Sequence, residues 1–283
     1  MEGPMKGMTS VVTGANSGIG FVVSTGLARL GSEVVMVCRD RAKGEAALAE
    51  IKRSTESGSV ELLLADLASL QSVRELASEV LTAHERVQVL VNNAGVIIGR
   101  RTVTPDGLES TFVVNYLSHF LLTQLLLDRL RRSSPARIVN VSSSAHYRGK
   151  MDFQDLQEER GYGASKAYSQ SKLAQVLFTH ELAKRLEGTG VTVNAVHPGA
   201  VRTHWGDEGG ALGIVIRIAR PFLLSPEEGG KTPMYVATSQ EVEGVSGRYF
   251  SKMKVVESSK ESYDEAEMRK LWDVSMKLCG LSQ

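Results

Sequence analysis

Thr13-Gly14-Ala15-Asn16-Ser17-Gly18-Ile19-Gly20 is the stretch that decides the fold. An apolar run from Met8 to Thr13 precedes it, and a segment suited to a helix follows it toward Leu30. A glycine-rich turn between a strand and a helix directs backbone N–H groups and the positive helix end at a place where a pyrophosphate can bind. The glycine spacing is wider than the ordinary G-x-G-x-x-G, and no Gly-Lys-Ser/Thr follows, which argues against a Walker-type site. The stretch therefore predicts a dinucleotide-binding α/β fold, with a bare packing turn as the alternative.

The composition is that of an ordinary globular protein. The chain has 283 residues, 42% hydrophobic and 23% charged, which is enough for a large buried core, and we expect a single domain over residues 1–283. Lys and Arg number 33 against 32 Asp and Glu, a formal net charge of +1 that provides no field for a polyanion. Nucleic-acid binding is therefore not expected.

The cysteines and the first residues of the sequence indicate the cellular compartment that we expect for the protein. Cys38 and Cys279 are far apart and show no Cys-x-x-Cys spacing, so a reduced interior is expected. Only seven residues precede the apolar run at Met8, too few for a signal peptide or a membrane anchor. The apolar run 211–224 is interrupted by two arginines and a proline and is too short to span a bilayer. We expect a cytoplasmic protein without a transmembrane anchor.

The end of the second expected strand, at 33–38, bears on the choice of cofactor. A carboxylate at this position holds the ribose hydroxyls of NAD, whereas a 2′-phosphate requires positive charge. The sequence is Cys38-Arg39-Asp40, so an arginine follows the strand directly and NADP(H) is favoured. Asp40 lies twenty residues after Gly20 and keeps NAD(H) open, and an arginine at a strand end can also be a solvated charge.

Two later strand ends carry polar residues that can serve a dinucleotide. Asp66-Leu67 follows the strand expected at 60–64, where Asp66 could receive the adenine amino group or cap a helix starting near Ser69. The strand expected at 87–91 runs into Asn92-Asn93-Ala94-Gly95, whose amides could lock the turn beside the cofactor or be ordinary turn chemistry.

The pair Tyr168 and Lys172 carries the candidate chemistry. Positions four apart on a helix lie one above the other, so the lysine amine can approach the phenol. A phenol has a pKa of ~10, and one ammonium at ~4 Å with an effective dielectric of ~20 supplies ~4 kcal/mol, enough to lower that pKa by ~3 units. Tyr162 and Lys166 have the same spacing, but glycines flank Tyr162, which argues for an irregular backbone. The sequence therefore favours Tyr168 as a proton shuttle.

Further polar residues fall near the same end of the expected sheet. Asn115 lies in an apolar helix expected at 108–131, either as a satisfied core amide that bends the helix or as part of a water-linked proton path. Ser142-Ser143-Ser144 follows the strand expected at 137–141, where open α/β sheets place their ligands.

The last third of the chain is expected to close the site. A strand at 191–196 ends in His197-Pro198-Gly199, and Thr203 just beyond could reach a nicotinamide amide. The glycine-rich and apolar stretch at about 204–226 suits a flap over an apolar pocket, with a peripheral core helix as the alternative. The remaining pattern predicts helices at 43–51, 71–82, 226–238 and 264–278 and a short final strand at 248–250. The six histidines show no metal-ligand spacing, so no metal site is expected.

Taken together, the motifs resemble those of the short-chain dehydrogenase/reductase family. They are Thr13-Gly14-x-x-x-Gly18-x-Gly20, Asn92-Asn93-Ala94-Gly95, Asn115, Ser143, Tyr168-x-x-x-Lys172 and Pro198-Gly199. Further stretches resemble the retinol-dehydrogenase-like branch, among them Cys38-Arg39-Asp40, Val139-Asn140-Val141-Ser142-Ser143, Ser171-Lys172-Leu173-Ala174, Ser246-Gly247-Arg248-Tyr249-Phe250 and Leu271-Trp272-Asp273. The resemblance implies a doubly wound, Rossmann-type, mostly parallel sheet with helices on both faces.

The resemblance also implies roles for individual residues. Tyr168 would exchange a proton with the substrate, Lys172 would lower the tyrosine pKa and bind the nicotinamide ribose, Ser143 would bind the substrate oxygen, and Asn115 would hold a relay water. Ser142 is the alternative to Ser143. The residues that would bind the cofactor are Gly14, Asn16, Ser17, Gly18, Ile19, Gly20, Arg39, Asp66, Leu67, Asn93, Ala94, Gly95, Tyr168, Lys172, Pro198, Gly199, Val201 and Thr203.

The implied activity is an NADP(H)-dependent interconversion of an apolar aldehyde or ketone, with a retinoid-like compound as one candidate, and its alcohol. An NAD-dependent alcohol dehydrogenase is one alternative, and a non-catalytic NADP(H)-binding sensor or scaffold is another. Many members of the branch carry a membrane-anchoring amino-terminal helix, which the first residues of this sequence do not resemble. Members of the family often form dimers or tetramers, so a homo-oligomer is compatible with the resemblance.

Overall fold

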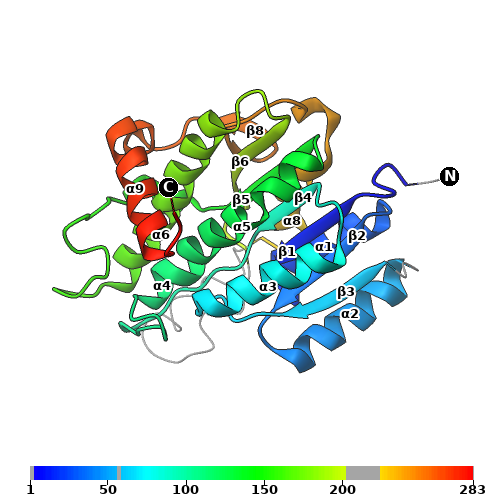
Figure 1. Ribbon diagram of the computed structural model, residues 1–283, viewed down its shortest axis with the longest axis horizontal. Helices are drawn as coiled ribbons and strands as arrows, with labels where there is room; N and C mark the ends of the chain where they lie inside the picture. The colour runs from blue at the N-terminus through cyan, green and yellow to red at the C-terminus, as the bar shows by residue number, and fades with distance from the viewer. Residues whose placement is uncertain (1–2, 56–58, 202–223, 283) are drawn as a thin grey trace.

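The computed structural model describes residues 3–55, 59–201 and 224–282, and their strands form one eight-stranded sheet (Figure 1). The strand order is β3-β2-β1-β4-β5-β6-β7-β8, and every neighbouring pair is parallel except β7 and β8. The strands are β1 Thr9–Thr13, β2 Glu33–Cys38, β3 Val60–Leu64, β4 Val89–Asn92, β5 Ala136–Val141, β6 Val191–His197, β7 Tyr249–Ser251 and β8 Lys254–Val256. The expected doubly wound, mostly parallel sheet is confirmed.

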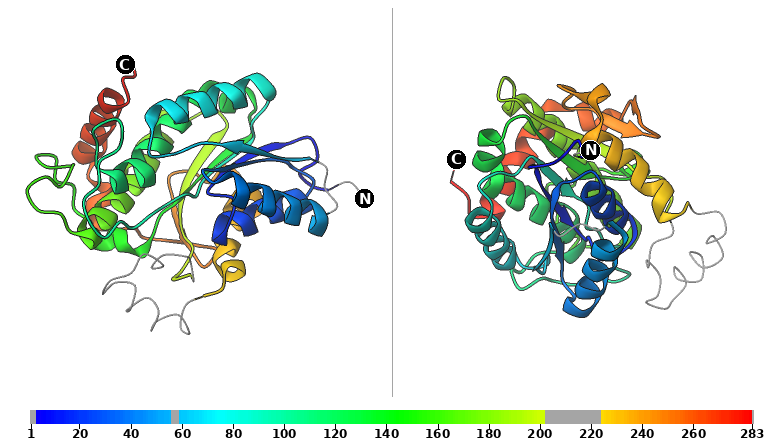
Figure 2. Two further views of the ribbon diagram at one scale, coloured as in Figure 1. Left: turned by 90° about the horizontal axis from the view of Figure 1, so that it is seen from below. Right: turned by 90° about the vertical axis from the view of Figure 1, so that its right-hand side faces the viewer.

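Helices cover both faces of this sheet (Figure 2). On one face lie α1 Gly18–Arg29, α2 Arg41–Thr55 and α8 Pro226–Thr238, and on the other lie α3 Leu70–Ala83, α5 Ser118–Arg132, α6 Ala164–Arg185 and α9 Glu265–Leu278. Each face has its own apolar core, which is why central strands such as β1 and β2 are buried along almost their whole length. The chain order reverses between β1 and β4, and in such sheets ligands bind at the carboxyl ends of the strands at this point.

The helix expected at 108–131 is interrupted. The structure has a short helix α4 at Ser110–Phe112, a π-helical segment η1 at Val113–Leu117, and then α5. Asn115 lies inside the π-helical segment, and its side chain bonds outside the helix, to the backbone of Val96 and to Ser171. A side chain that draws the backbone toward external partners widens the turn, and π-helical turns are frequent at functional sites.

The end of the sheet differs from the expectation in one respect. The strand expected last, at 248–250, is β7, but β8 follows it as an antiparallel edge strand. The tight turn between them places Lys252 and Met253 at positive φ, 52° and 60°. Hairpin turns of this kind are normally signalled by Asn or Gly. Because β8 is exposed throughout and its turn lacks those residues, the sequence contains no recognisable signal for it.

One helical run among the described residues, Ser110–Arg132, is long and apolar enough to cross a membrane. Its most apolar stretch is 83% buried inside the protein, where it packs between α3 and α6. Its hydrophobicity is therefore that of a core helix.

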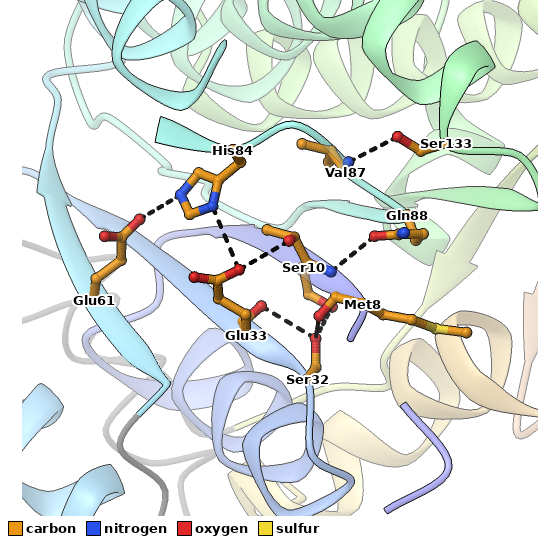
Figure 3. A network of polar contacts seen from close by, with 10 residues as sticks. Met8, Ser10, Ser32, Glu33, Glu61, His84, Val87, Gln88 and Ser133 are labelled. Atoms are coloured by element: carbon orange, nitrogen blue, oxygen red, sulfur yellow. Dashed lines mark hydrogen bonds and ion pairs between the residues drawn. The ribbon is translucent and has the colours of Figure 1, made fainter. Parts of the chain in front are cut away.

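A polar network ties together the amino ends of the strands, at the edge opposite the ligand-binding edge (Figure 3). The ring of His84, which follows α3, contacts the carboxylates of Glu61 on β3 at 2.6 Å and Glu33 on β2 at 3.5 Å. Gln88 accepts a hydrogen bond from the backbone N–H of Thr9 at 2.8 Å. These contacts hold β1, β2 and β3 in register with the connection into β4.

Aromatic rings join α5, α6 and α9 on one face of the sheet. The ring of Phe120 lies 5.2 Å from that of Phe178 and 5.2 Å from that of Trp272, between ring centroids, and all three are buried. Edge-to-face and tilted pairs at such distances add to the apolar burial. This cluster anchors the carboxyl-terminal helix beside α6.

Replacing Phe120 with alanine should lower the free energy of unfolding by about 3–5 kcal/mol, because it empties the centre of that cluster. Denaturant unfolding followed by circular dichroism measures the change. Arg131→Ala, on the same helix but exposed, should change it by less than about 0.5 kcal/mol. Equal effects of the two substitutions would contradict the placement of Phe120 in the core.

Candidate active site

The glycine turn lies at the carboxyl end of β1 and leads into α1. Gly14 and Gly18 have positive φ, 66° and 55°. A Cβ on Gly20 would lie 2.2 Å from the carbonyl oxygen of Gly14, so only glycine permits this close turn. Asn16 and Ser17 directly precede α1 in this turn, at the carboxyl end of β1.

The amino end of α1 is suited to a phosphate. Ser17 caps this helix in an extended conformation, and within the described residues its side chain makes no capping hydrogen bond. The first turn, which includes Ile19, has no acidic residue. Helices α3 and α8, by contrast, are capped by serine side chains. The N–H groups of α1 are therefore available to an anion, and a dinucleotide pyrophosphate fits here.

Asn93 locks the glycine turn against the end of β4. Its side-chain N–H donates to the carbonyl oxygen of Thr13 at 2.8 Å. The Thr13 hydroxyl in turn accepts the backbone N–H groups of Asn93 at 2.9 Å and Ala94 at 3.0 Å. Both strand ends at the reversal point are thus held by one threonine and one asparagine.

The candidate residues for the adenosine end lie after β2 and β3. Arg39 is exposed directly after β2, while a carboxylate oxygen of Asp40 accepts the backbone N–H of Lys43 at 3.0 Å and so caps α2. Asp66 is not the cap of α3, which is an alternative that the sequence left open. That helix is capped by Ser69, and Asp66 instead accepts the N–H of Ala68 at 3.0 Å. The neighbouring Leu67 is buried in the core.

Tyr168 and Lys172 lie on the buried side of α6, facing the same crevice. The lysine Nζ is 5.6 Å from the centre of the tyrosine ring. The side chains are 8% and 3% exposed. The Tyr168 phenol hydrogen-bonds with the Ser143 side chain. The hydroxyl of Ser142 is used elsewhere, because it donates to the backbone carbonyl of Lys172 at 2.9 Å.

The electrostatics of this pair differ from the expectation of an acidified tyrosine. Burial raises the pKa of Tyr168 above its usual value, and the hydrogen bond from Ser143 only partly offsets this. Burial also lowers the pKa of the Lys172 amine to about 7. The amine donates to the carbonyl of Val141 at 3.0 Å and to the side chain of Gln175 at 2.9 Å. In this structure Tyr168 therefore keeps its proton at neutral pH, while Lys172 is only partly charged.

Asn115 is a fully bonded core amide. Its oxygen accepts the N–H of Val96 at 2.7 Å, and its nitrogen donates to Val96 O and to the Ser171 hydroxyl, both at 3.0 Å. A Cβ on Gly95 would lie 3.4 Å from the Asn115 oxygen and 3.5 Å from the Lys172 nitrogen. Both polar groups therefore lie within van der Waals reach of the end of β4.

The second tyrosine–lysine pair has other partners. Tyr162 lies before α6 and donates its hydroxyl proton to the carbonyl of Ile98 at 2.6 Å. Lys166 pairs with the buried carboxylate of Glu158 at 3.0 Å. The hydroxyl of Tyr162 and the amine of Lys166 thus bond to separate partners, whereas the Lys172 amine lies over the Tyr168 ring.

The loop after β6 is described only in part. Pro198 and Gly199 follow the strand, with Gly199 at a φ of +91°, and Val201 forms a parallel bridge with Leu224. Thr203 and most of the flap expected at 204–226 lie outside the described residues.

Two histidines, His146 and His119, hydrogen-bond to residues of the site, a role that the sequence did not predict. His146 donates from Nδ1 to the carbonyl of Ser143 at 2.7 Å and accepts the N–H of Ser259 at 3.1 Å, so it holds the serine backbone. His119, four residues after Asn115, contacts the Thr13 hydroxyl at 3.1 Å. The spacing of four residues from Asn115 is the one feature of the sequence that places His119 on the same side of the helix as that residue.

The comparisons with known proteins agree with this geometry. A family model described as short chain dehydrogenase matches residues 8–210. Human retinol dehydrogenase 14 is 46% identical over 297 residues, which cover 99% of this chain and 88% of that protein. An uncharacterized protein from Mycobacterium paratuberculosis has a TM-score of 0.79 at 34% identity, covering 98% of this chain and 95% of that one. The complex of Pseudomonas aeruginosa RhlG with NADP has a TM-score of 0.69 at 26% identity, covering 87% and 94%.

The matched region contains the glycine turn and every residue placed in the crevice above, from Thr13 to Val201. The resemblance seen in the sequence is confirmed, and the chain belongs to the short-chain dehydrogenase family of oxidoreductases, in its retinol-dehydrogenase-like branch.

Proposed function

We propose that the protein interconverts an apolar aldehyde or ketone and its alcohol, with NADP(H) as the cofactor. The observation that carries this proposal is the gathering of Ser143, Tyr168 and Lys172 beside the glycine turn, at the ligand-binding edge of the sheet. The relatives at 46% identity are named retinol dehydrogenases, which supports an apolar, retinoid-like substrate.

The proposed chemistry divides between a cofactor and the chain. A bound dinucleotide would supply or accept the hydride. The hydroxyls of Ser143 and Tyr168, which bond to each other, would both hold the substrate oxygen. Because burial keeps the phenol protonated, Tyr168 is ready to donate a proton to the oxygen of a carbonyl substrate. A charged Lys172 would then stabilise the phenolate that remains.

The preference for NADP(H) rests on the residues after β2. Asp40 is the acid that could hold a ribose diol, but its carboxylate caps α2. Arg39 is exposed at the strand end, where a 2′-phosphate would lie in this fold. The NADP complex of RhlG supports the same choice.

Tyr168→Phe should lower turnover by roughly 10²–10⁴-fold, the usual contribution of a general acid, while leaving NADPH binding nearly intact. The measurements are NADPH consumption with an apolar aldehyde or ketone and cofactor binding by fluorescence. Tyr162→Phe is the matched control and should retain turnover, because that hydroxyl bonds to the Ile98 backbone. Normal turnover in Tyr168→Phe would reject the assignment.

Arg39→Ala should weaken NADP(H) binding by roughly 10-fold or more, because a charge-assisted contact to the 2′-phosphate is lost, and should change NAD(H) binding little. Calorimetric titration with both cofactors measures this. Arg41→Ala, two residues on, removes a charge already paired with Glu45 and should affect neither cofactor. If Arg39→Ala weakened both cofactors equally, the argument for NADP(H) would fail.

Carbonyl reduction should decline as the pH rises through about 7, the pKa of the Lys172 amine. Below this value the amine is charged and stabilises the phenolate formed when Tyr168 gives up its proton; above it this help is lost. The check is the pH dependence of kcat/KM for NADPH oxidation. A rate of reduction that increased steadily from neutral to alkaline pH would contradict this role of Lys172.

A further inference from the structure

The Lys172 amine has a side-chain partner that no part of the mechanism above uses. Val141 offers a backbone oxygen, which would be present with any residue there. Gln175 offers a side-chain oxygen, at 2.9 Å from Nζ and one helical turn further along α6. Both side chains are almost completely buried, with Gln175 1% exposed. A charge-assisted hydrogen bond at this distance in a dry interior is among the stronger polar contacts of a protein.

The amide of Gln175 has a defined orientation. A protonated amine can only donate, so the atom facing Lys172 must be the amide oxygen. The amide nitrogen then faces inward and lies 3.4 Å from Nδ1 of His119 on α5. The side chain of Gln175 is thus enclosed between the amine and an imidazole ring.

The protonation of His119 follows from its partners. The Thr13 hydroxyl already accepts two backbone N–H groups, so its proton is left for an acceptor, and Nε2 of His119 at 3.1 Å is nearer than the carbonyl oxygen of Val91 at 3.4 Å. Nε2 is therefore the acceptor, and Nδ1 carries the ring proton, which it donates to the carbonyl of Asn115 at 3.2 Å. Burial and the nearby Lys172 charge lower the pKa of His119 to about 3. The ring stays neutral and adds no second positive charge beside the amine.

We propose that Gln175 is a positioning residue for the reaction, holding the Lys172 amine toward the crevice and sustaining its positive charge. The neutral His119 ring packs against the Gln175 amide nitrogen without accepting a hydrogen bond from it, because Nδ1 already carries the ring proton, and its Nε2 bonds to Thr13 beside the glycine turn. The assignment rests on the proposed function only where it treats the Lys172 charge as an aid to proton transfer.

Among the groups that surround the Lys172 amine, Gln175 is the side chain that offers an oxygen acceptor to its charge. The titratable neighbours are the Tyr168 phenol on the same helix and the His119 imidazole on α5. β5 presents the backbone oxygen of Val141, and the segment after β4 presents Gly95. Burial is the cause of the low pKa of Lys172, and the acceptors that face its amine in the described part of the chain are the uncharged oxygens of Val141 and Gln175.

Two substitutions of similar size test the proposal. Gln175→Leu removes the acceptor and should lower the pKa of Lys172 by about one unit. Gln175→Glu places a carboxylate at the same distance and should raise it by one unit or more. The measurement is a pH titration of the ¹³Cε resonance in lysine-labelled protein, with the Lys172 signal identified by its loss in Lys172→Arg. Shifts in the same direction, or none, would overturn the proposal.

Gln170→Leu is the matched control. Gln170 is also on α6 and 1% exposed, but its amide bonds to the backbone of Asp152 and Leu156. This variant should lose stability without moving the Lys172 titration. A shift as large as that of Gln175→Leu would show that general loosening is the cause, and the proposal would be rejected. If Gln175→Leu does not fold, the upward shift expected in Gln175→Glu decides alone.

The titration needs no substrate, so it separates this inference from the proposed function. Opposite shifts in the two variants without any carbonyl reduction by the native protein would retain the role of Gln175 and reject the activity. If the native protein reduces a carbonyl compound but neither substitution shifts the Lys172 titration, the activity is retained and the role of Gln175 is rejected. With both intact, the alkaline decline of kcat/KM should move by the same number of pH units as the resonance.

Discussion

The Thr13 hydroxyl is the contact on which the nucleotide side of the molecule depends. It accepts the N–H groups of Asn93 and Ala94 and faces His119, so one side chain joins the ends of β1 and β4 to α5. These are the two strands between which the order of the sheet reverses. Backbone groups left without a partner at such a point would each cost about 1–3 kcal/mol. The hydroxyl therefore holds the ends of β1 and β4 together without the help of a ligand.

The sequence predicted the sheet well because its signals are local. The apolar run Glu33–Cys38 coincides with β2, since a strand buried on both faces has no polar face to confuse the pattern. The strand expected at 60–64 coincides with β3, although β3 lies at the edge of the sheet and is only partly buried. The i, i+4 spacing of Tyr168 and Lys172 was enough to place both side chains in one crevice. Ser143 was distinguishable from Ser142 only by resemblance, and the structure separates them through the backbone carbonyl that Ser142 bonds.

The features that the sequence did not predict depend on contacts between distant segments. The π-helical segment around Asn115 depends on Val96 and Ser171, which no helical pattern reveals. β8 pairs with β7 through backbone atoms alone, and its exposed side chains have no period to detect. Each case is one of tertiary context overriding local preference.

The protonation of the Tyr168–Lys172 pair shows why spacing alone does not determine chemistry. By spacing alone, one ammonium at ~4 Å would act on the phenol with its full charge. In the folded protein, burial disfavours both the phenolate of Tyr168 and the ammonium of Lys172. The amine also donates two hydrogen bonds, to Val141 and to Gln175. A buried pair of this kind titrates as a unit, so whatever stabilises the amine charge also determines how readily the phenol gives up its proton. The acidity of the tyrosine is therefore set as much by the acceptors around Lys172 as by the distance between the two groups, and those acceptors are visible only in the fold.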